Sequence, residues 1–299
     1  MPDAIDVVRR FNRSYTQRIG ALEDSFLGMG MPLGPTRLLF EIGAASATAP
    51  GGPAAPTTQA LRERLGLDSG YLSRLLRRLE RDGLVAVTPE PADRRRRRVS
   101  LTEAGREWRQ ELERRSDDRA HLIVDPLTEG QRARLVRALT DADLLVRAAT
   151  VTFEPVDPAD PVARDVVGRY FAEIGRRFGF DASGEAEKDV RLLAPPAGVF
   201  VVAVSDGEPV ACGGLQTIAP GVGELKRMWV HDDWRGAGLG SRLLRHLEAQ
   251  ARGLGHTIAR LDTNKALTEA IAMYQRAGYH EVGRYNDNPW ATHFFEKSL

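Results

Sequence analysis

The sequence predicts two domains of different fold class, a mainly helical domain with a strand hairpin followed by an α/β domain. At 299 residues the chain has room for about two domains of ordinary size. Before about residue 148 the apolar residues mostly recur at helical spacing. After residue 150 short apolar strands alternate with amphipathic helices, which is typical of an α/β fold. We therefore expect one domain over residues 1–148 and a second over 149–299, with almost no linker between them.

The composition is that of an ordinary globular protein, with 42% hydrophobic and 28% charged residues. No apolar run approaches the ~18 residues of a membrane span, and the start MPDAIDVVRR lacks the apolar core of a signal peptide. The single cysteine, Cys212, lies in an apolar run and is expected to be a small buried residue. A cytoplasmic location with no membrane partner is therefore expected.

Six helices are expected in the first domain, over residues 5–19, 35–42, 57–66, 68–81, 102–120 and 129–147. Asp68 and Thr102 stand where helix N-caps are needed, and Thr128 with Gln131 forms a possible capping box. The Ala, Pro and Gly residues of 44–56 favour a loop. The fourth helix carries leucines on one side and Arg on the other, and its polar front consists of Ser73, Arg74, Arg77, Arg78 and Arg81.

This arrangement predicts a helix-turn-helix followed by a winged hairpin. An apolar back with an Arg-rich front suits the major groove of DNA, although a solvated surface helix has the same pattern. The arginines 94–98 stand at the tip of the hairpin, where adjacent cations repel one another unless a polyanion lies nearby. The narrow minor groove of DNA supplies such a field. The two features together favour DNA binding.

The segments DSGYLSRLLRRLERDGLV and DRRRRRVSLTEAG resemble the MarR family of transcriptional regulators over about residues 5–147. Asp93 and Arg95 match the family's Asp-x-Arg pair, in which the Asp braces the wing and the Arg enters the minor groove. The resemblance implies double-stranded operator DNA as a partner and a homodimer formed through the N-terminal domain. The wing residues expected at DNA are Asp93, Arg94, Arg95, Arg96 and Arg97.

The second domain contains a glycine-rich turn between the strand expected at 224–230 and the helix expected at 240–254. Free backbone N–H groups at a helix N-terminus form an anion site, and glycine lets the backbone approach a pyrophosphate closely. The turn lacks the third glycine of a dinucleotide fingerprint, because position 241 is Ser, and it lacks the Gly-Lys-Ser/Thr of a P-loop.

The pattern Arg235-x-x-Gly238-x-Gly240 instead resembles the coenzyme A motif of the GNAT acetyltransferases, which have an α/β fold with a mixed central sheet. The later Ala270-x-x-x-Tyr274-x-x-x-Gly278-Tyr279 is similar to that family's second signature. The resemblance implies acetyl-CoA as cosubstrate, with Tyr274 protonating the departing thiolate. The residues implied to hold acetyl-CoA are Met228, Val230, Arg235, Gly236, Ala237, Gly238, Leu239, Gly240, Ser241 and Asn264. Many members have Asn where this chain has Leu267, and Asn264 lies out of register with it.

An acceptor amine attacks a thioester only when neutral, and a lysine-like amine is neutral in only about 0.04% of molecules at pH 7. A base is therefore needed, and Glu224 matches the position of a water-linked Glu in several family members. A surface glutamate at a strand end is the alternative. Acceptor specificity is expected from segments 170–181 and 285–290, where Arg176 and Arg177 are either a carboxylate clamp or a solvated helix face. The histidines lack metal-ligand spacing, so no metal is expected.

Three functional hypotheses follow. In the first, the chain is a dimeric regulator and an acetyltransferase acting on a small amine or amino-acid-like acceptor. In the second, the C-terminal domain is a non-catalytic acetyl-CoA sensor that regulates DNA binding. In the third, it is a protein-lysine acetyltransferase recruited to DNA. A deep pocket favours the first hypothesis and an open groove favours the third.

Overall fold

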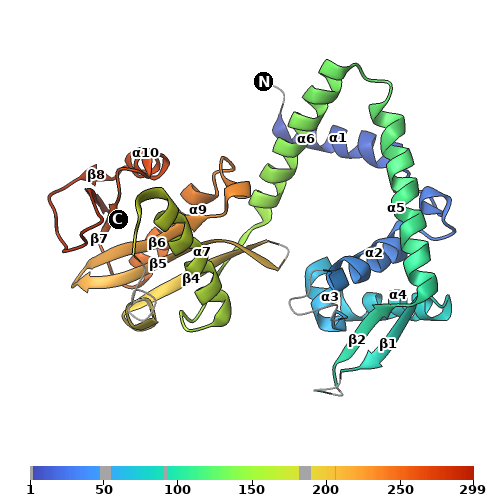
Figure 1. Cartoon of the computed structure of the whole chain (residues 1–299), viewed down its shortest axis with the longest axis horizontal. Helices are drawn as coiled ribbons and strands as arrows, with labels where there is room; N and C mark the ends of the chain where they lie inside the picture. Colours follow the sequence, from blue (N-terminus) through green and yellow to red (C-terminus); the bar gives the residue numbers. More distant parts are fainter. Residues whose placement is uncertain (1–2, 48–54, 91–92, 94, 182–189, 206) are drawn as a thin grey trace. The chain divides into compact units, whose positions relative to one another are not determined.

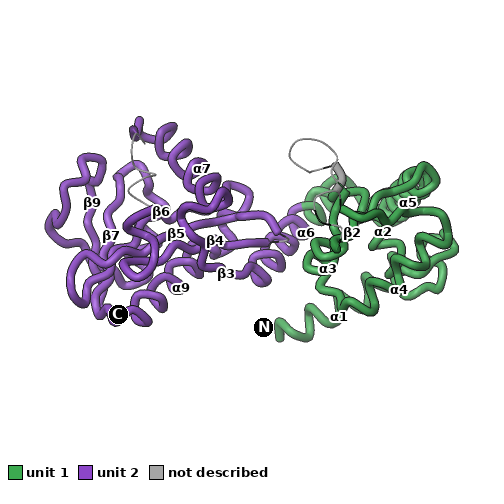
Figure 2. Tube along the Cα trace, turned by 90° about the horizontal axis from the view of Figure 1, so that it is seen from below, with its two compact units in different colours: residues 1–136 green, residues 137–299 purple. Residues whose placement is uncertain are grey.

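The computed structural model describes residues 3–47, 55–90, 93, 95–181, 190–205 and 207–299. The chain divides into two compact units, Met1–Val136 and Arg137–Leu299 (Figure 2). The division falls inside helix α6 (Glu129–Thr150), whereas the sequence places a domain boundary after residue 148, near the end of that helix. No described helix combines the length and the apolar character that crossing a bilayer requires.

The core of the first unit lies between three helices and a two-stranded hairpin. These are α2 (Leu33–Ala47), α3 (Thr58–Leu65), α4 (Ser69–Arg81), β1 (Val85–Pro89) and β2 (Arg97–Leu101). Gly66 ends α3 in the left-handed region, and Asp68 caps α4 by accepting a hydrogen bond from the N–H of Tyr71. The leucines expected on the back of α4 are all buried there, as Leu72, Leu75, Leu76 and Leu79. The helix-turn-helix and its hairpin form as the sequence predicts.

The remaining helices of this unit are α1 (Ala4–Arg18) and α5 (Glu103–Val124), with a short 3-10 turn at Phe26–Gly28. Thr102 caps α5 through the N–H of Gly105, and Thr128 and Gln131 form the expected capping box at the start of α6. One expectation is wrong. Helix α2 does not stop near Ile42 but continues through Gly43 to Ala47, because the alanines of this stretch are good helix formers.

The second unit is built on one mixed sheet of order β3-β4-β5-β6-β7-β9-β8 (Figure 1). All neighbouring strands are antiparallel except β6 and β7, which are parallel. The strands are β3 (Thr152–Pro155), β4 (Gly198–Ser205), β5 (Glu208–Ala219), β6 (Val222–Val230), β7 (Ile258–Thr263), β8 (His280–Glu281) and β9 (His293–Ser298). The sequence predicts five of these strands, and it misses the short edge strands β3 and β8.

Helices cover both faces of this sheet. Along β4, Val201 and Ala203 face a core completed by α9 (Leu239–Gly253) and α10 (Thr268–Arg276). The alternate residues Phe200 and Val202 face a second core completed by α7 (Pro161–Phe178). This alternation along one strand produces three layers, and the result belongs to the α/β class that the sequence pattern favours.

Strands β6 and β7 pair only over Val222–Leu225 and Ile258–Leu261. The second half of β6 pairs with β5 alone, and the register between those strands shifts at a bulge. Within this half Arg227 has a φ of +55°, which a residue with a side chain rarely adopts. The sheet therefore opens between Lys226–Val230 and the end of β7, and the candidate site lies at this opening.

Candidate functional site

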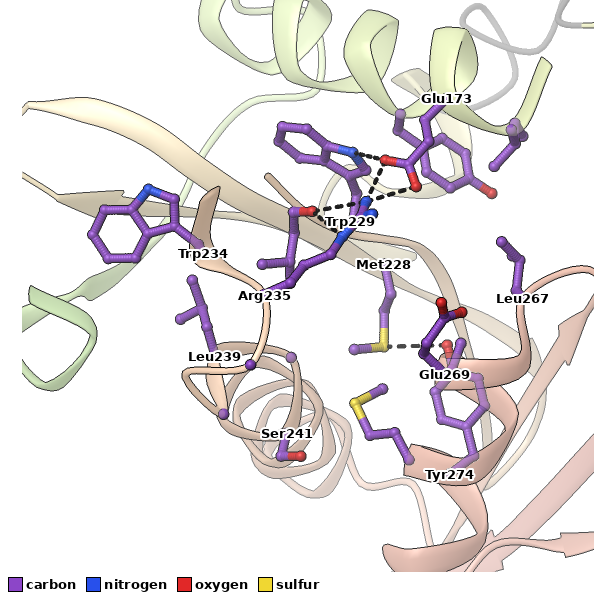
Figure 3. A pocket seen from close by; sticks show the side chains of 18 of the residues that line it. Glu173, Met228, Trp229, Trp234, Arg235, Leu239, Ser241, Leu267, Glu269 and Tyr274 are labelled. Atoms are coloured by element: carbon purple, nitrogen blue, oxygen red, sulfur yellow. Dashed lines mark hydrogen bonds and ion pairs between the residues drawn. The ribbon is translucent and has the colours of Figure 1, made fainter. Parts of the chain in front are cut away.

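A cavity of about 390 Å³ lies between the second half of β6, the N-terminus of α9, α10 and α7 (Figure 3). Met228 and Val230 of β6 form one side of it, and Tyr274 of α10 forms another. The glycine-rich turn contributes its own stretch of the wall, with Arg235, Gly236, Gly238, Leu239, Gly240 and Ser241. The structure thus gathers around one cavity most of the residues that the sequence assigns to acetyl-CoA.

The turn before α9 presents backbone N–H groups to this cavity. Gly236 and Gly238 have φ values of +83° and +75°, and an added Cβ at either position would meet no atom within 4 Å. Among the described residues, no backbone hydrogen bond occupies the N–H groups of 236–241. Unpaired N–H groups at the start of a 15-residue helix bind anions, and the open space above the glycines leaves room for one. This cradle fits a pyrophosphate.

Arg235 is expected to help hold acetyl-CoA, but its contacts in the structure are with other residues of the chain. Its own N–H already bonds the carbonyl of Asp232 at 3.1 Å, so that amide is not free for an anion. Its guanidinium instead contacts both oxygens of Glu173 at 2.6 Å and Asp232 at 2.7 Å. Arg235 therefore ties the glycine turn to α7.

Glu173 is the centre of this tie, as Figure 3 shows. Besides Arg235, its carboxylate accepts a 2.8 Å hydrogen bond from the indole N–H of Trp229 and pairs with Arg177 at 2.9 Å. Arg177 also pairs with Glu269 on α10, at 3.4 Å. One partly buried carboxylate thus joins α7, β6 and the glycine turn, and Arg177 extends the network to Glu269 on α10.

Tyr274 is buried on α10, and its hydroxyl donates to the sulfur of Met228 at 3.9 Å. Burial raises the pKa of this phenol well above its usual value, and the nearby Tyr170 and Asp262 act in the same direction. The hydroxyl therefore stays protonated at every pH of ordinary enzyme chemistry. It stands ready as a hydrogen-bond donor.

A second, smaller cavity of about 80 Å³ shares Tyr274 and Met228 with the first. Part of its lining is polar, with Asp262, Asn264 and Asn288, and another part forms an aromatic wall. The aromatic wall consists of Phe178, Phe180 and Trp290, whose ring centroids lie 5.6–6.4 Å from one another. The segments 170–181 and 285–290, which the sequence predicts to set acceptor specificity, both contribute to this cavity.

A cluster of two carboxylates lies beside the second cavity. Lys226 pairs with Glu224 at 3.2 Å and with Asp262 at 3.6 Å, and Asn286 donates to the same two carboxylates at 2.9 and 2.6 Å. Glu224 also accepts from Tyr285 at 3.0 Å and from Gln216. Four donors therefore hold Glu224, whose side chain is 3% exposed.

Three residues predicted from the sequence occupy other places. Ala237 packs against the core beneath the turn. Asn264 lines the second cavity, where its amide donates to the carbonyl of Trp290 at 2.7 Å and accepts from the N–H of Ala266. Glu224 is buried and is not among the residues that line either cavity. Its role as the base remains a prediction.

Neither Glu173 nor Asp262 is predicted from the sequence as a site residue. Asp262 stands at the polar end of a predicted strand, which is a signal for a site residue. Glu173 precedes Arg177 by one helical turn, but that spacing is common on solvated helices and carries little information. Of the two arginines left open, Arg176 is exposed, whereas Arg177 lines the first cavity and is held by two carboxylates.

In the first unit, the polar front of α4 is open to solvent. Ser73, Arg74, Arg77 and Arg81 are exposed, and Arg78 is half-buried beside Asp82 at 3.8 Å. Figure 1 shows α4 beside the hairpin of β1 and β2. The five residues that the sequence predicts for the recognition helix thus lie on the side of α4 opposite its buried leucines.

The hairpin carries its arginines in two different settings. Asp93 accepts the N–H of Arg95 at 3.0 Å and braces the turn, and Arg95, Arg96 and Arg97 are exposed. The run of five arginines predicts that Arg98 is part of the tip, and this prediction is wrong. Arg98 lies on β2, where it bonds Glu90 at 2.6 Å and the carbonyl of Ala55 at 2.9 Å. Arg94 lies outside the described residues.

Acidic, cysteine and histidine side chains do not gather in a group of three or more that could hold a metal ion, within the part of the chain that the structure describes.

Comparison with known proteins matches each unit to a family. Residues 169–279 match the acetyltransferase (GNAT) family, and residues 30–96 match the MarR family. An IAA acetyltransferase of Azospirillum brasilense is 33% identical over 142 residues, which cover 46% of this chain and 92% of that protein. An aminoglycoside N(6')-acetyltransferase type 1 of Stenotrophomonas maltophilia is 27% identical over 46% of this chain and 91% of its own length. A GNAT-family acetyltransferase structure from Staphylococcus aureus, at 16% identity and a TM-score of 0.45, covers 50% of this chain and 99% of that one.

Proposed function

We propose that this chain, which belongs to the GNAT acetyltransferase family and carries a MarR-family region before that domain, acetylates a small primary amine and also regulates transcription. The C-terminal domain is an acetyl-CoA-dependent N-acetyltransferase. What we propose beyond this is the acceptor class, the roles of individual residues and the DNA-binding activity.

The observation that carries the enzymatic proposal is the cradle of unpaired N–H groups at α9, open to the cavity that leads to Tyr274. In this proposal the N–H groups of 236–241 hold the pyrophosphate. The pantetheine arm lies along Met228 and Val230, where β6 no longer pairs with β7. The thioester then reaches Tyr274, where the two cavities meet.

Two proton transfers complete the reaction. The amine must lose a proton before it attacks, and the thiolate must gain one as it leaves. We assign the second transfer to the hydroxyl of Tyr274, which burial keeps protonated. We assign the first to the carboxylate pair of Glu224 and Asp262, which Lys226 and Asn286 hold together.

The N-terminal domain is proposed to bind double-stranded DNA as a homodimer. The exposed arginines of α4 and of the hairpin support the DNA contact, since an exposed cationic front opposite an apolar back suits the major groove. Helix α1 supports the dimer, because it has no buried residue and exposes Ile5, Val8 and Phe11.

The size of the second cavity favours an acceptor that inserts a small group over one as bulky as an aminoglycoside. The test is an acceptor screen that measures free thiol released from acetyl-CoA by the full-length chain. Small primary amines are expected to give release that depends on both substrates. Acetyl-CoA binding without thiol release from any amine would contradict catalysis and support the sensor hypothesis.

A further inference from the structure

The residues that line the second cavity indicate which class of amine the enzyme accepts. This inference rests on the proposed acetyl transfer. The cavity meets the acetyl-CoA cavity at Tyr274 and Met228. An acceptor amine must reach the thioester carbon at this junction. The groups that line the 80 Å³ cavity are therefore the groups that the acceptor contacts.

The two carboxylates of the cluster are not equivalent toward this cavity. Glu224 lies behind the lining, held by Gln216, Lys226, Tyr285 and Asn286. Asp262 lines the cavity, and its Oδ1 accepts one long hydrogen bond of 3.3 Å from Asn288. A carboxylate oxygen can accept two hydrogen bonds. Asp262 therefore has acceptor capacity facing the cavity, and Glu224 orients the Lys226 and Asn286 side chains that hold it.

The charge of the cluster suits a cation. Lys226 neutralises one of the two carboxylates that it bridges, so the Glu224–Lys226–Asp262 group keeps one negative charge. Arg227 also lines the cavity, and its guanidinium lies over the ring of Phe171, 4.9 Å from the centroid. The negative charge of the cluster balances the charge of one ammonium group. A second ammonium group in the cavity would be repelled by the positive charges of Lys226 and Arg227.

The aromatic wall of the same cavity determines what the ammonium is attached to. Phe178, Phe180 and Trp290 pack on one another and present ring surface to the cavity, without a carboxylate or amide of their own. Ring surface favours apolar groups and gives a hydroxyl little to bond, and a second ammonium would meet only ring faces there, without a carboxylate to balance its charge. The small volume leaves room for an amine and a few carbon atoms.

We propose that the acceptor is a compact apolar monoamine, bound as its ammonium ion with the nitrogen on Asp262 and the carbon body on Phe178, Phe180 and Trp290. Asp262 takes one proton from the ammonium, and solvent later removes it. The nitrogen lone pair forms the C–N bond to the acetyl carbon while the C–S bond breaks. Tyr274 delivers its hydroxyl proton to the sulfur, and the second proton of the nitrogen, lost as the amide forms, restores that hydroxyl, so the products are the amide, the thiol and the one proton that Asp262 passed to solvent.

The first test compares Asp262→Asn with Asp287→Asn, a matched control whose side chain is exposed and does not line the cavity. Asp262→Asn is expected to lower kcat/KM for butylamine by about 10²–10⁴-fold while acetyl-CoA affinity, measured by calorimetry, stays within about twofold. Retained acetyl-CoA affinity also shows that the variant is folded. Asp287→Asn is expected to match wild type within about twofold.

The second test compares butylamine with putrescine, which has the same four-carbon chain and differs only in carrying a second ammonium on its far carbon in place of a hydrogen. Butylamine is expected to have the higher kcat/KM by about 10–100-fold, since burying the apolar end favours it. Trp290→Leu should narrow this ratio, because it removes part of the aromatic wall. The variant should still fold, since the backbone hydrogen bonds of residue 290 to Asn264 and Asn288 do not depend on the indole. Equal or better use of putrescine would overturn the proposed acceptor class.

A binding measurement separates this inference from the proposed function. Calorimetry of butylamine with the CoA-saturated enzyme needs no turnover, and wild type is expected to bind where Asp262→Asn does not. Binding without thiol release would contradict the proposed catalysis and leave the cavity assignment in place. Thiol release that survives unchanged in Asp262→Asn would overturn the assignment and leave the catalysis in place.

Discussion

The hydroxyl of Tyr274 donates to the sulfur of Met228 across 3.9 Å, at the junction of the two cavities. A thioether is a weak acceptor, so this hydrogen bond is easily exchanged for a stronger one. Met228 can contact the phenol because the pairing of β6 with β7 ends at Leu225, three residues earlier on β6. The geometry therefore leaves a protonated phenol with a weak partner where a thiolate would depart.

We expect Tyr274→Phe to lower kcat with little change in acetyl-CoA affinity. Phenylalanine keeps the ring that packs against Tyr279 and Phe295 but removes the proton donor. General acid catalysis contributes about 10²–10⁴-fold, and a thiolate is a fair leaving group, so a decrease near the lower end is expected. Steady-state kinetics with calorimetric acetyl-CoA affinities check this. A Tyr274→Phe enzyme with wild-type kcat would remove the phenol from the mechanism.

We expect the defect of Glu224→Gln to shrink as pH rises. Near neutral pH the acceptor is an ammonium and needs the carboxylate cluster, whereas toward its own pKa of about 10 it deprotonates unaided. Tyr274→Phe should show no such recovery, because the hydrogen bond that it removes does not depend on the amine. The measurement is the pH dependence of kcat/KM for both variants, and parallel profiles would contradict the division of roles.

The regular parts of this fold follow from local sequence signals. The N-caps Asp68 and Thr102, and the glycine turn at Gly236 and Gly238, are where the sequence places them because the hydrogen bonds and φ angles involved are local. The edge strands β3 and β8 escape detection because they are four and two residues long, too short for a periodicity.

The parts of the site that the sequence does not reveal are those made by distant segments. Glu173 becomes part of the site only through its contact with Arg235, 62 positions away. Asp262 does so through its contacts with Lys226 on β6 and with Asn286 in a later loop. Arg98 is similar, since nothing in a run of five arginines marks the one that will meet Glu90. Tertiary pairing of this kind has no local pattern.

We expect the hairpin arginines to separate into two classes on mutation. Replacing Arg95, Arg96 and Arg97 by Ala should weaken binding to any DNA duplex and reduce its salt dependence. The log–log slope should fall by up to about 0.9 for each phosphate that the variant no longer neutralises. The measurement is fluorescence anisotropy with duplex DNA over a range of salt. An unchanged slope would contradict a wing that binds phosphates.

The neighbouring Arg98→Ala is the control for this variant. This variant removes the ion-pair partner of Glu90, whose side chain is only 12% exposed. Because a buried carboxylate without a partner is costly, we expect the free energy of unfolding to decrease by about 1–3 kcal/mol. Its salt slope should remain that of wild type.

We expect the last turns of α6 to belong to the acetyltransferase domain. Ala148 and Val151 are buried in its core, and Arg242 of α9 donates to the carbonyls of both residues. Arg147 lies over Trp234, 4.5 Å from its centroid, and Trp234 lines the acetyl-CoA cavity. A fragment of residues 137–299 should therefore melt ~4–8 °C above one of 152–299, since the burial that the shorter fragment lacks is worth about 2 kcal/mol. Equal melting temperatures in calorimetry would place the boundary after α6.

Acetyl-CoA binding is proposed to require the anion cradle at α9, and the most direct test is calorimetric titration of acetyl-CoA into paired glycine variants. Gly238→Glu places a carboxylate in the cradle, whereas Gly255→Glu adds the same group at an equally unusual φ of +84°, in a turn that does not line either cavity. We expect Gly238→Glu to abolish binding and Gly255→Glu to bind like wild type, with similar melting temperatures for the two variants. Acetyl-CoA binding by Gly238→Glu at the wild-type affinity would contradict this proposal.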